Sequence, residues 1–253
     1  MNSHLLEIED VETGYGEIQV LRGISFQLDA GERAGLFGPN GHGKTTLLRT
    51  ISGLLKPWRG SIRFQDTAIG GKSPVEIVDR GIIHVSQGNT LFHRMTVIEN
   101  LTLGAYSRRA WPLRKQNLEK VFALFPRLAE RRQQLVRTLS GGERQMVALG
   151  IGLMGEGSLL MLDEPTLGLA PKLKEELMEA IDMVSKSGMP LILVEQDVEF
   201  LLALTDRLYF VEKGQIVFSQ EKGGAQLEHE QIMQMYFGGS DRRAVATLRE
   251  DNA

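Results

Sequence analysis

The stretch GLFGPNGHGKTTLL, residues 35 to 48, places glycines, a lysine and two threonines between two apolar runs. Gly38, Gly43, Lys44 and Thr45 match the pattern G-x-x-x-x-G-K-[ST]. Glycines let a backbone turn its N–H groups inward around an anion, and a helix starting there adds its positive end. The lysine would contact the β- and γ-phosphates of a nucleotide, and the threonine hydroxyl would bind Mg²⁺. The stretch therefore predicts a phosphate-binding loop.

The alternative for this stretch is a glycine-rich turn between a strand and a helix that binds nothing. The apolar run before it and the helical pattern after it favour phosphate binding. His42 occupies a free position of the motif, and we expect its side chain to point outward. The candidate binding residues of the loop are Gly38, Pro39, Asn40, Gly41, His42, Gly43, Lys44 and Thr45.

Two adjacent carboxylates end a second apolar run, LLMLDEP. Asp163 can reach Mg²⁺, and Glu164 can position or deprotonate an attacking water as a general base. A surface turn that closes a strand is the structural alternative. The phosphate-binding loop upstream favours the catalytic interpretation, with Asp163 as metal ligand and Glu164 as base.

The segment LSGGERQ, residues 139 to 145, predicts a second helix start able to bind an anion, at Ser140, Gly141 and Gly142. One γ-phosphate does not need two such binding elements from one chain. Two chains in a head-to-tail pair would need both, because each Ser140 terminus would close over the nucleotide held by the other chain. A plain helix cap is the alternative.

Composition limits the classes of protein that remain. The chain has 253 residues, a formal net charge of −3 and no cysteine. The cysteine count excludes disulfides and thiolate chemistry, and the charge argues against a nucleic-acid binder. The acidic N-terminus does not read as a signal peptide, and the apolar run 146–155 is too short to span a bilayer. We expect a soluble chain that works at a membrane only through a partner.

Periodicity predicts an α/β core interrupted by a helical insertion. We expect an antiparallel pair at 5–16 and 18–32, a strand at 60–69 and a hairpin over 207–220 that turns at Lys213 and Gly214. Buried strands are expected at 33–38, 81–87, 158–165 and 190–197. Helices are expected at 44–54, 96–106, 113–125, 141–154 and 172–188.

With these motifs in this order, residues 5 to 238 resemble the ABC transporter ATPase family. The resemblance rests on GPNGHGKTT, the Gln87 segment HVSQGNTLF, LSGGERQ and LLMLDEP. It implies a P-loop NTPase (ABC ATPase) α/β core with an N-terminal antiparallel β subdomain and an inserted α-helical subdomain. We expect one domain, with the core at 1–87 and 156–238, the helical subdomain at 88–155 and a tail at 239–253.

The resemblance implies roles for further residues. Tyr15 would stack on the adenine of ATP, and Thr46 would bind phosphate. Gln87 would contact Mg²⁺ and the attacking water and link the site to the helical subdomain. That subdomain would dock a helix of a membrane subunit.

Within the family, the chain is similar to the smaller ATPase subunit of branched-chain amino acid importers, on DEPTLGLAP, LVEQDVEFLLALTDRLYFVEKGQI and the ending QMYFGG. Urea and short-amide importer ATPases are the alternative. The implied partners are a second ABC ATPase subunit in a homo- or heterodimer, two transmembrane permease subunits and, indirectly, a solute-binding protein. The implied location is the cytoplasmic face of the inner (plasma) membrane.

Two positions depart from the family pattern. Gln196 stands where most members have a histidine, and Ala170 stands where an aspartate is usual. A glutamine amide can donate to a γ-phosphate oxygen but cannot relay a proton. We therefore expect Gln196 to act in catalysis as a donor only.

Three further hypotheses follow from the remaining features. The basic stretch 108–137 is either a set of solvated helix faces or a surface for anionic lipid or an acidic partner. Its aromatics form no stacking pattern, so no nucleic-acid partner is expected. A soluble ABC ATPase acting on DNA or ribosomes is a lesser alternative, because the chain has one cassette and no long heptad run. A P-loop kinase or GTPase would have no use for LSGGERQ.

Overall fold

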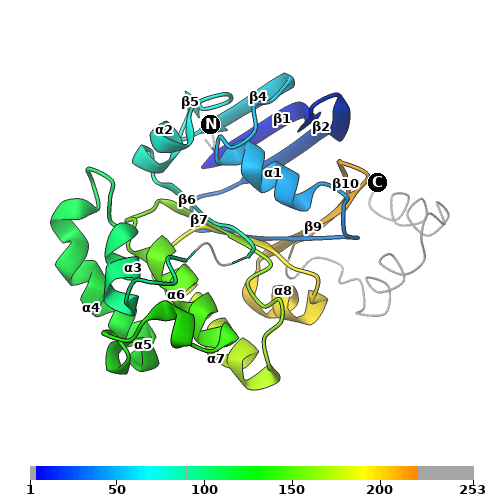
Figure 1. Cartoon of the computed structure of the whole chain (residues 1–253). Helices are drawn as coiled ribbons and strands as arrows, with labels where there is room; N and C mark the ends of the chain where they lie inside the picture. The colour runs from blue at the N-terminus through cyan, green and yellow to red at the C-terminus, as the bar shows by residue number, and fades with distance from the viewer. Residues whose placement is uncertain (1–3, 89–90, 222–253) are drawn as a thin grey trace.

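The computed structural model describes residues 4–88 and 91–221. Two β-sheets lie at one end of the molecule, and most helices lie at the other (Figure 1). Mixed α/β sheets with an N-terminal antiparallel subdomain confirm the expected fold class. The tail at 239–253 falls outside the described residues.

The smaller sheet is antiparallel and has four strands in the order β2-β1-β4-β5. Its strands are β1 (Leu6–Tyr15), β2 (Ile18–Leu28), β4 (Arg59–Phe64) and β5 (Thr67–Ala68). The expected single strand at 60–69 is wrong, because Gln65 and Asp66 both adopt positive φ and reverse the chain. Two successive left-handed residues form the tight turn that joins antiparallel strands.

The larger sheet has six strands in the order β10-β9-β3-β8-β7-β6. Its strands are β3 (Arg33–Phe37), β6 (Ile82–Val85), β7 (Leu159–Asp163), β8 (Leu191–Val194), β9 (Arg207–Glu212) and β10 (Gln215–Glu221). All pairings are parallel except β9–β10. The expected hairpin is confirmed, and its turn residues Lys213 and Gly214 both have positive φ.

The larger sheet separates two hydrophobic cores. Along β7, Leu159 and Met161 belong to the core shared with the smaller sheet, and Leu160 and Leu162 belong to the other core. This alternation follows from the two-residue period of a strand. Because both faces are covered, the strand is apolar at every position before Asp163.

Helix α1 (Lys44–Ile51) packs in the core between the two sheets. It ends three residues before the expected Leu54, because Gly53 adopts a positive φ of 76°. Any Cβ there would also lie 2.6 Å from the Lys72 carbonyl oxygen. The turn after α1 therefore needs a glycine, and the helix cannot continue through it.

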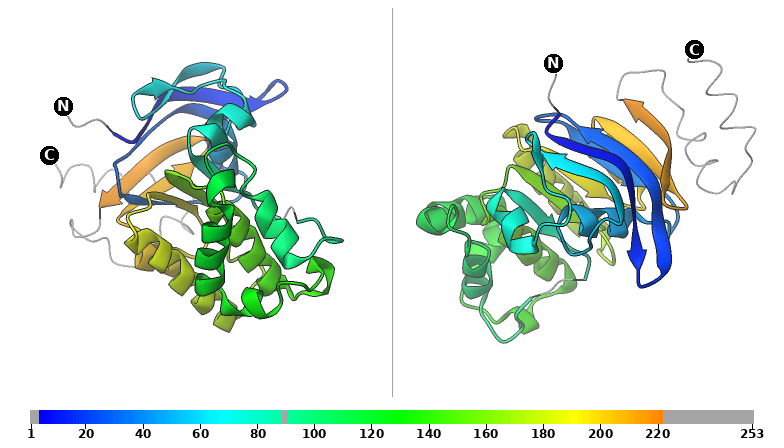
Figure 2. Two further views of the ribbon diagram at one scale, coloured as in Figure 1. Left: turned by 90° about the vertical axis from the view of Figure 1, so that its left-hand side faces the viewer. Right: turned by 90° about the horizontal axis from the view of Figure 1, so that it is seen from above.

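The remaining helices are α2 (Pro74–Asp79), α3 (Val97–Leu103), α4 (Arg114–Leu124), α5 (Pro126–Glu130), α6 (Gly141–Leu153), α7 (Pro171–Lys186) and α8 (Val198–Leu204), with 3₁₀ turns at Trp111–Leu113 and Val136–Thr138. Helices α3 to α8 cover the outer face of the larger sheet and extend to one side of it (Figure 2), whereas α2 buries Ile77 in the core shared with the smaller sheet. Elements α3 to α6 interrupt the chain between β6 and β7.

Across the described residues, every helix is too short or too polar to cross a membrane.

Several charges of the basic stretch 108–137 pair with acids outside it. The ion pairs are Lys120–Glu156, Arg127–Glu176 and Arg131–Glu143. Arg114 instead stacks over Trp111, with its guanidinium carbon 4.3 Å from the ring centroid. The exposed excess of positive charge is therefore smaller than the sequence count indicates.

His84 on β6 is a half-buried titratable group beside the end of α1. Its Nδ1 lies 3.1 Å from Ser52 Oγ, at the end of α1, and its Nε2 is buried without a hydrogen-bond partner. Burial, assisted by the Arg49 charge, lowers the pKa of His84 to about 4. The folded chain therefore keeps this imidazole neutral at pH values where an exposed histidine is protonated.

We expect His84 to make the fold sensitive to acid. Its pKa is 6.5 unfolded and about 4 folded, so the neutral ring stabilises the fold fully above pH 6.5. This contribution to the free energy of unfolding is lost as the pH drops toward 4. The loss is about 3 kcal/mol, because each unit of pKa difference corresponds to about 1.4 kcal/mol. In denaturant titrations, His84→Asn should lose less free energy of unfolding between pH 7 and pH 4 than the wild type. His93→Asn, at an exposed position, should follow the wild type; parallel curves for His84→Asn would contradict the assignment.

Candidate functional site

The loop after β3 bends back on itself before α1 begins. Gly38 and Gly43 have φ values of 143° and 107°, which side-chain-bearing residues rarely adopt. A Cβ at Gly38 would lie 2.2 Å from the Val211 carbonyl oxygen, so the loop passes close to β9. Both glycines of the motif are therefore required by the backbone path.

Lys44 is the first residue of α1 and is 4% exposed. Its Nζ donates to the carbonyl oxygens of Gly38, at 2.6 Å, and Pro39, at 3.1 Å. Burial lowers the pKa of Lys44, although the carboxylates of Glu164 and Asp163 partly offset this effect. The ammonium group is thus held inside the curve of the loop, where it can meet an anion.

Thr45 and Asp163 join the loop to the end of β7. The Thr45 hydroxyl donates to Asp163 Oδ1 at 3.1 Å, while Asp163 Oδ2 is buried without a hydrogen-bond partner. Burial raises the pKa of Asp163, and the Thr45 hydrogen bond opposes this shift. A hydroxyl beside an unpartnered carboxylate oxygen fits Mg²⁺, which prefers hard oxygen ligands.

The Glu164 carboxylate is held between two glutamine amides. Oε2 accepts from Gln87 Nε2 at 2.8 Å, and Oε1 accepts from Gln196 Nε2 at 3.0 Å. Glu164 itself has a positive φ of 47°, and its backbone N–H donates to the Val194 carbonyl at 2.9 Å. Residues that follow three parallel strands, β6, β7 and β8, therefore fix one carboxylate.

These side chains border a cavity of about 500 Å³. The cavity is lined by Tyr15, Val20, Asn40, Gly41, Gly43, Lys44, Thr45, Thr46, Gln87, Glu164, Leu167 and Gln196. Tyr15 is 41% exposed, and its hydroxyl lies 3.5 Å from Thr46 Oγ1 and accepts from Arg49 at 3.0 Å. The cavity is therefore lined by the aromatic ring of Tyr15, by the phosphate-binding loop and by the Glu164 carboxylate.

His42 does not border this cavity. Its side chain is half-buried with Nδ1 enclosed, and its carbonyl accepts from the Gly214 N–H at 3.0 Å. Its absence from the cavity fits an outward-pointing side chain, although the ring is only half exposed where the β9–β10 turn packs against the loop. Gly38 and Pro39 contribute carbonyl oxygens to Lys44 rather than cavity surface.

Ser140, Gly141 and Gly142 are also absent from the cavity lining. They begin α6, where the Ser140 hydroxyl accepts from the Glu143 N–H and Glu143 Oε2 accepts from the Ser140 N–H. Ser140 and Gly141 are exposed, whereas Gly142 is buried so close to Leu173 that a Cβ would lie 2.3 Å from it. This helix start therefore faces solvent on a surface separate from the cavity.

The structure adds a carboxylate that our sequence analysis missed. Glu195 is 3% exposed and accepts from the backbone N–H groups of Thr166, at 2.8 Å, and Gln196, at 3.2 Å. These hydrogen bonds hold the segment after Glu164 against the end of β8. Burial raises the pKa of Glu195. The signal was available, because LILVEQ ends an apolar strand with a polar pair just as LLMLDE does.

Replacing the buried Lys44 by methionine should separate binding from stability. Because burial disfavours the ammonium group, we expect Lys44→Met to unfold at the same or a higher denaturant concentration than the wild type. Its affinity for a Mg²⁺-free nucleoside triphosphate should fall by about tenfold or more, because charge-assisted hydrogen bonds to phosphate are lost. Titration calorimetry and denaturant melts measure the two effects. Lys115→Met, at an exposed position on α4, is the matched control; a Lys44→Met variant that binds as tightly as this control would refute the role.

The family model described as ABC transporter matches residues 21–167. The high-affinity branched-chain amino acid transport ATP-binding protein BraG of Pseudomonas aeruginosa is 40% identical over 235 residues, covering 93% of this chain and 100% of that protein. The probable branched-chain amino acid transport ATP-binding protein LivF of Archaeoglobus fulgidus is 31% identical over 235 residues, covering 92% and 99%.

Solved structures agree with these relatives. A nucleotide-free ATP-binding cassette from an ABC transporter superposes with a TM-score of 0.79 at 25% identity, covering 96% of this chain and 99% of that chain. The ADP conformation of another such cassette gives 0.78 at 28% identity, covering 96% and 98%. With the family model, the near full-length relatives and the shared cassette architecture in agreement, this chain belongs to the ABC transporter ATP-binding family.

Proposed function

We propose that the chain binds and hydrolyses ATP to power an importer of branched-chain or other hydrophobic amino acids. The observation that carries the catalytic part is Glu164, whose carboxylate faces the phosphate-binding cavity between Gln87 and Gln196. The solute is proposed from the near full-length similarity to proteins named for branched-chain amino acid transport.

ATP would lie along the cavity from Tyr15 to Glu164. The exposed face of Tyr15 would stack on adenine, and Thr46 and the loop N–H groups would contact phosphate oxygens. Lys44 would exchange its two carbonyl acceptors for the β- and γ-phosphates. The proposed nucleotide ligands that border the cavity are Tyr15, Asn40, Gly41, Gly43, Lys44, Thr45 and Thr46. Gly38, Pro39 and His42 belong to the same loop and would act through its shape, since none of them borders the cavity.

Thr45, Asp163 and Gln87 would hold Mg²⁺ beside the phosphates. The unpartnered Asp163 Oδ2 supports this assignment, because it is a buried acceptor with no donor in the protein. When bound, Mg²⁺ supplies neutralisation of the charge that develops on the transferred phosphoryl group. Thr45 would contribute its hydroxyl after giving up its 3.1 Å hydrogen bond to Asp163.

Glu164 would act as the general base toward the attacking water. Each of its oxygens already accepts one amide hydrogen, and a carboxylate has further lone pairs for a water proton. Gln87 and Gln196 would fix its orientation. Gln196 has no titrating proton, so it would donate to Glu164 or to a γ-phosphate oxygen and would not relay a proton.

Each cavity is half of a proposed composite site. The α6 start at Ser140, Gly141 and Gly142 faces solvent away from the cavity, so a second chain arranged head-to-tail would have to bring this terminus over the nucleotide. Exposed Leu167, which borders the cavity, would lie at the contact between the chains. Exposed Ala170 has no side-chain donor or acceptor to offer across that contact.

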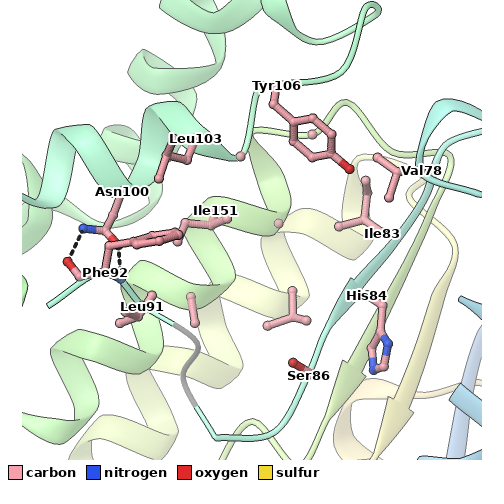
Figure 3. Close-up of a pocket in the computed structure, with 15 residues that line it drawn as sticks. Val78, Ile83, His84, Ser86, Leu91, Phe92, Asn100, Leu103, Tyr106 and Ile151 are labelled. Carbon is pink, nitrogen blue, oxygen red and sulfur yellow. Dashed lines mark hydrogen bonds between the residues drawn. The ribbon is translucent and has the colours of Figure 1, made fainter. Parts of the chain in front are cut away.

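A groove between β6 and the helices is the proposed permease contact. It encloses about 340 Å³ and is lined by residues that include Leu91, Phe92, Leu103, Tyr106 and Ile151 (Figure 3). Phe92 and Tyr106 are both 59% exposed, so the rim is largely apolar. Each of the two paired ATPase chains would offer one such groove to a cytoplasmic helix of one of two permease subunits. This contact would place the chain peripherally at the inner membrane. A solute-binding protein would act only through the permease.

Removing the proton acceptor should stop turnover and leave binding intact. Glu164→Gln keeps the shape and the hydrogen-bonding reach of the side chain, so we expect ATP affinity near that of wild type and ATP-dependent dimerisation. Hydrolysis should fall by about 10² or more, as is typical of a lost general base. Phosphate release and size-exclusion chromatography with ATP measure these effects. Near-normal turnover would refute the base assignment.

The membrane role is tested by capture of the same variant. Tagged Glu164→Gln extracted gently with ATP from native membranes should co-purify with two multi-span proteins and a second ATPase or a second copy. Recovery of only soluble partners, ribosomes or DNA would overturn the transport proposal and leave the ATP chemistry intact.

The composite site predicts a loss at Ser140 that is independent of nucleotide affinity. Ser140→Arg places a bulky side chain at the exposed start of α6, so turnover should fall by about 10² while ATP affinity stays near wild type. Ser73→Arg is the matched control, because Ser73 makes the same capping box at α2, with its hydroxyl accepting from Glu76 N–H. Both variants lose about 1 kcal/mol of helix capping. Equal turnover in the two variants would contradict the head-to-tail site.

A further inference from the structure

A third cavity, of about 420 Å³, lies between α4, the end of α6, the end of α7 and the beginning of β7. It has no lining residue in common with the nucleotide cavity. It shares only Ile83 and Gly152 with the groove proposed for the permease, so those two residues form a common wall. Its volume falls within the range of about 300–1,000 Å³ that is usual for small-ligand sites.

Most residues that line this cavity are apolar, and Met183 among them is partly exposed at the surface. Its lining includes Val121, Leu160, Met183, Val184 and Met189. Two thioether side chains make an adaptable apolar surface, because methionine can follow the outline of different aliphatic groups. The interior therefore suits an aliphatic side chain of a few carbons.

Opposite charges stand at the border of the same cavity. Lys120 Nζ and Glu156 Oε1 are 3.5 Å apart, and both residues line the cavity. The Lys120 side chain is 59% exposed and that of Glu156 is 30% exposed, so the pair can be opened at little cost. A ligand that carries both a carboxylate and an ammonium group can satisfy both partners at once.

Asn117 provides an independent indication that a polar group binds here. It is 1% exposed and lines the cavity, and its Oδ1 is buried with no hydrogen-bond partner. Its Nδ2 makes one long hydrogen bond, of 3.4 Å, to the Met154 carbonyl. A buried amide acceptor without a donor is uncommon, and a rotation of the Asn117 amide toward the cavity would let an ammonium group supply the donor.

We propose that this cavity binds a small zwitterion with an aliphatic side chain, that is, an aliphatic α-amino acid. The ligand carboxylate would pair with Lys120, its ammonium group with Glu156 and Asn117, and its side chain would contact the methionine-lined interior. Because ammonium and carboxylate are attached to one carbon, they match a cation and an anion that lie side by side. The inference concerns a site separate from ATP and does not depend on the transported solute.

The direct test is calorimetric titration of the full chain, without nucleotide, with four probes. L-leucine should bind saturably. Isoamylamine, which lacks the carboxylate, and 4-methylpentanoate, which lacks the ammonium group, should each bind about tenfold or more weakly, because each forfeits a charge-assisted contact. L-lysine, with a charged side chain, should not bind measurably. Equal binding of leucine and either single-charge analogue would overturn the proposal, as would the absence of saturable leucine binding in the millimolar range.

Variants locate the binding within the molecule. Lys120→Met should weaken leucine binding about tenfold or more, whereas Lys115→Met, which removes an exposed lysine from the same helix but does not border the cavity, should bind as wild type. Ala123→Phe fills the cavity from an exposed position of α4 and should abolish leucine binding. Circular dichroism and ATP titration establish that each variant is folded. Unchanged leucine binding in Lys120→Met and Ala123→Phe would overturn the assignment.

Discussion

The parallel direction of β3, β6, β7 and β8 is the constraint on which the site depends. Because the carboxyl ends of parallel strands meet at one edge of a sheet, four loops that are distant in the chain converge there. They carry the phosphate-binding loop, Gln87, the Asp163–Glu164 pair and the Glu195–Gln196 pair. The convergence is seen at the Glu164 carboxylate, which accepts one hydrogen bond from an amide on each of two other loops.

Several charged side chains are buried at this edge of the sheet, which is unfavourable for the stability of the fold. Three charged groups lie here, each at most 4% exposed: Lys44, Asp163 and Glu195. Burial lowers the pKa of Lys44 and raises the pKa of both carboxyl groups, so in each case it favours the neutral form. Each group is nevertheless held by a nearby donor or acceptor, so the cost is limited. Buried charges kept close to one another in this way are characteristic of sites that must meet a multiply charged ligand.

The three cavities lie at different parts of the chain, and a different ligand is proposed for each. The proposed nucleotide cavity lies at the carboxyl edge of the larger sheet, and the apolar groove and the zwitterion cavity lie on either side of a wall that includes Ile83 and Gly152. A Cβ on Gly152 would lie 2.6 Å from a Val85 methyl group, so α6 and β6 are in close contact at this wall. A ligand on one side therefore contacts residues that also border the other side.

Local chemistry is what the sequence by itself determined. The glycines of the loop, the buried strands that precede each polar pair and the turn at Lys213 and Gly214 are set by residues within a few positions of one another, so their patterns predict them. Tertiary structure alone decided that Glu195 fastens Thr166, that Asn117 has an unpartnered oxygen and that Ser140 lies apart from the cavity. Burial and distance between residues far apart in the chain have no local signature, because they depend on how the sheets and helices pack.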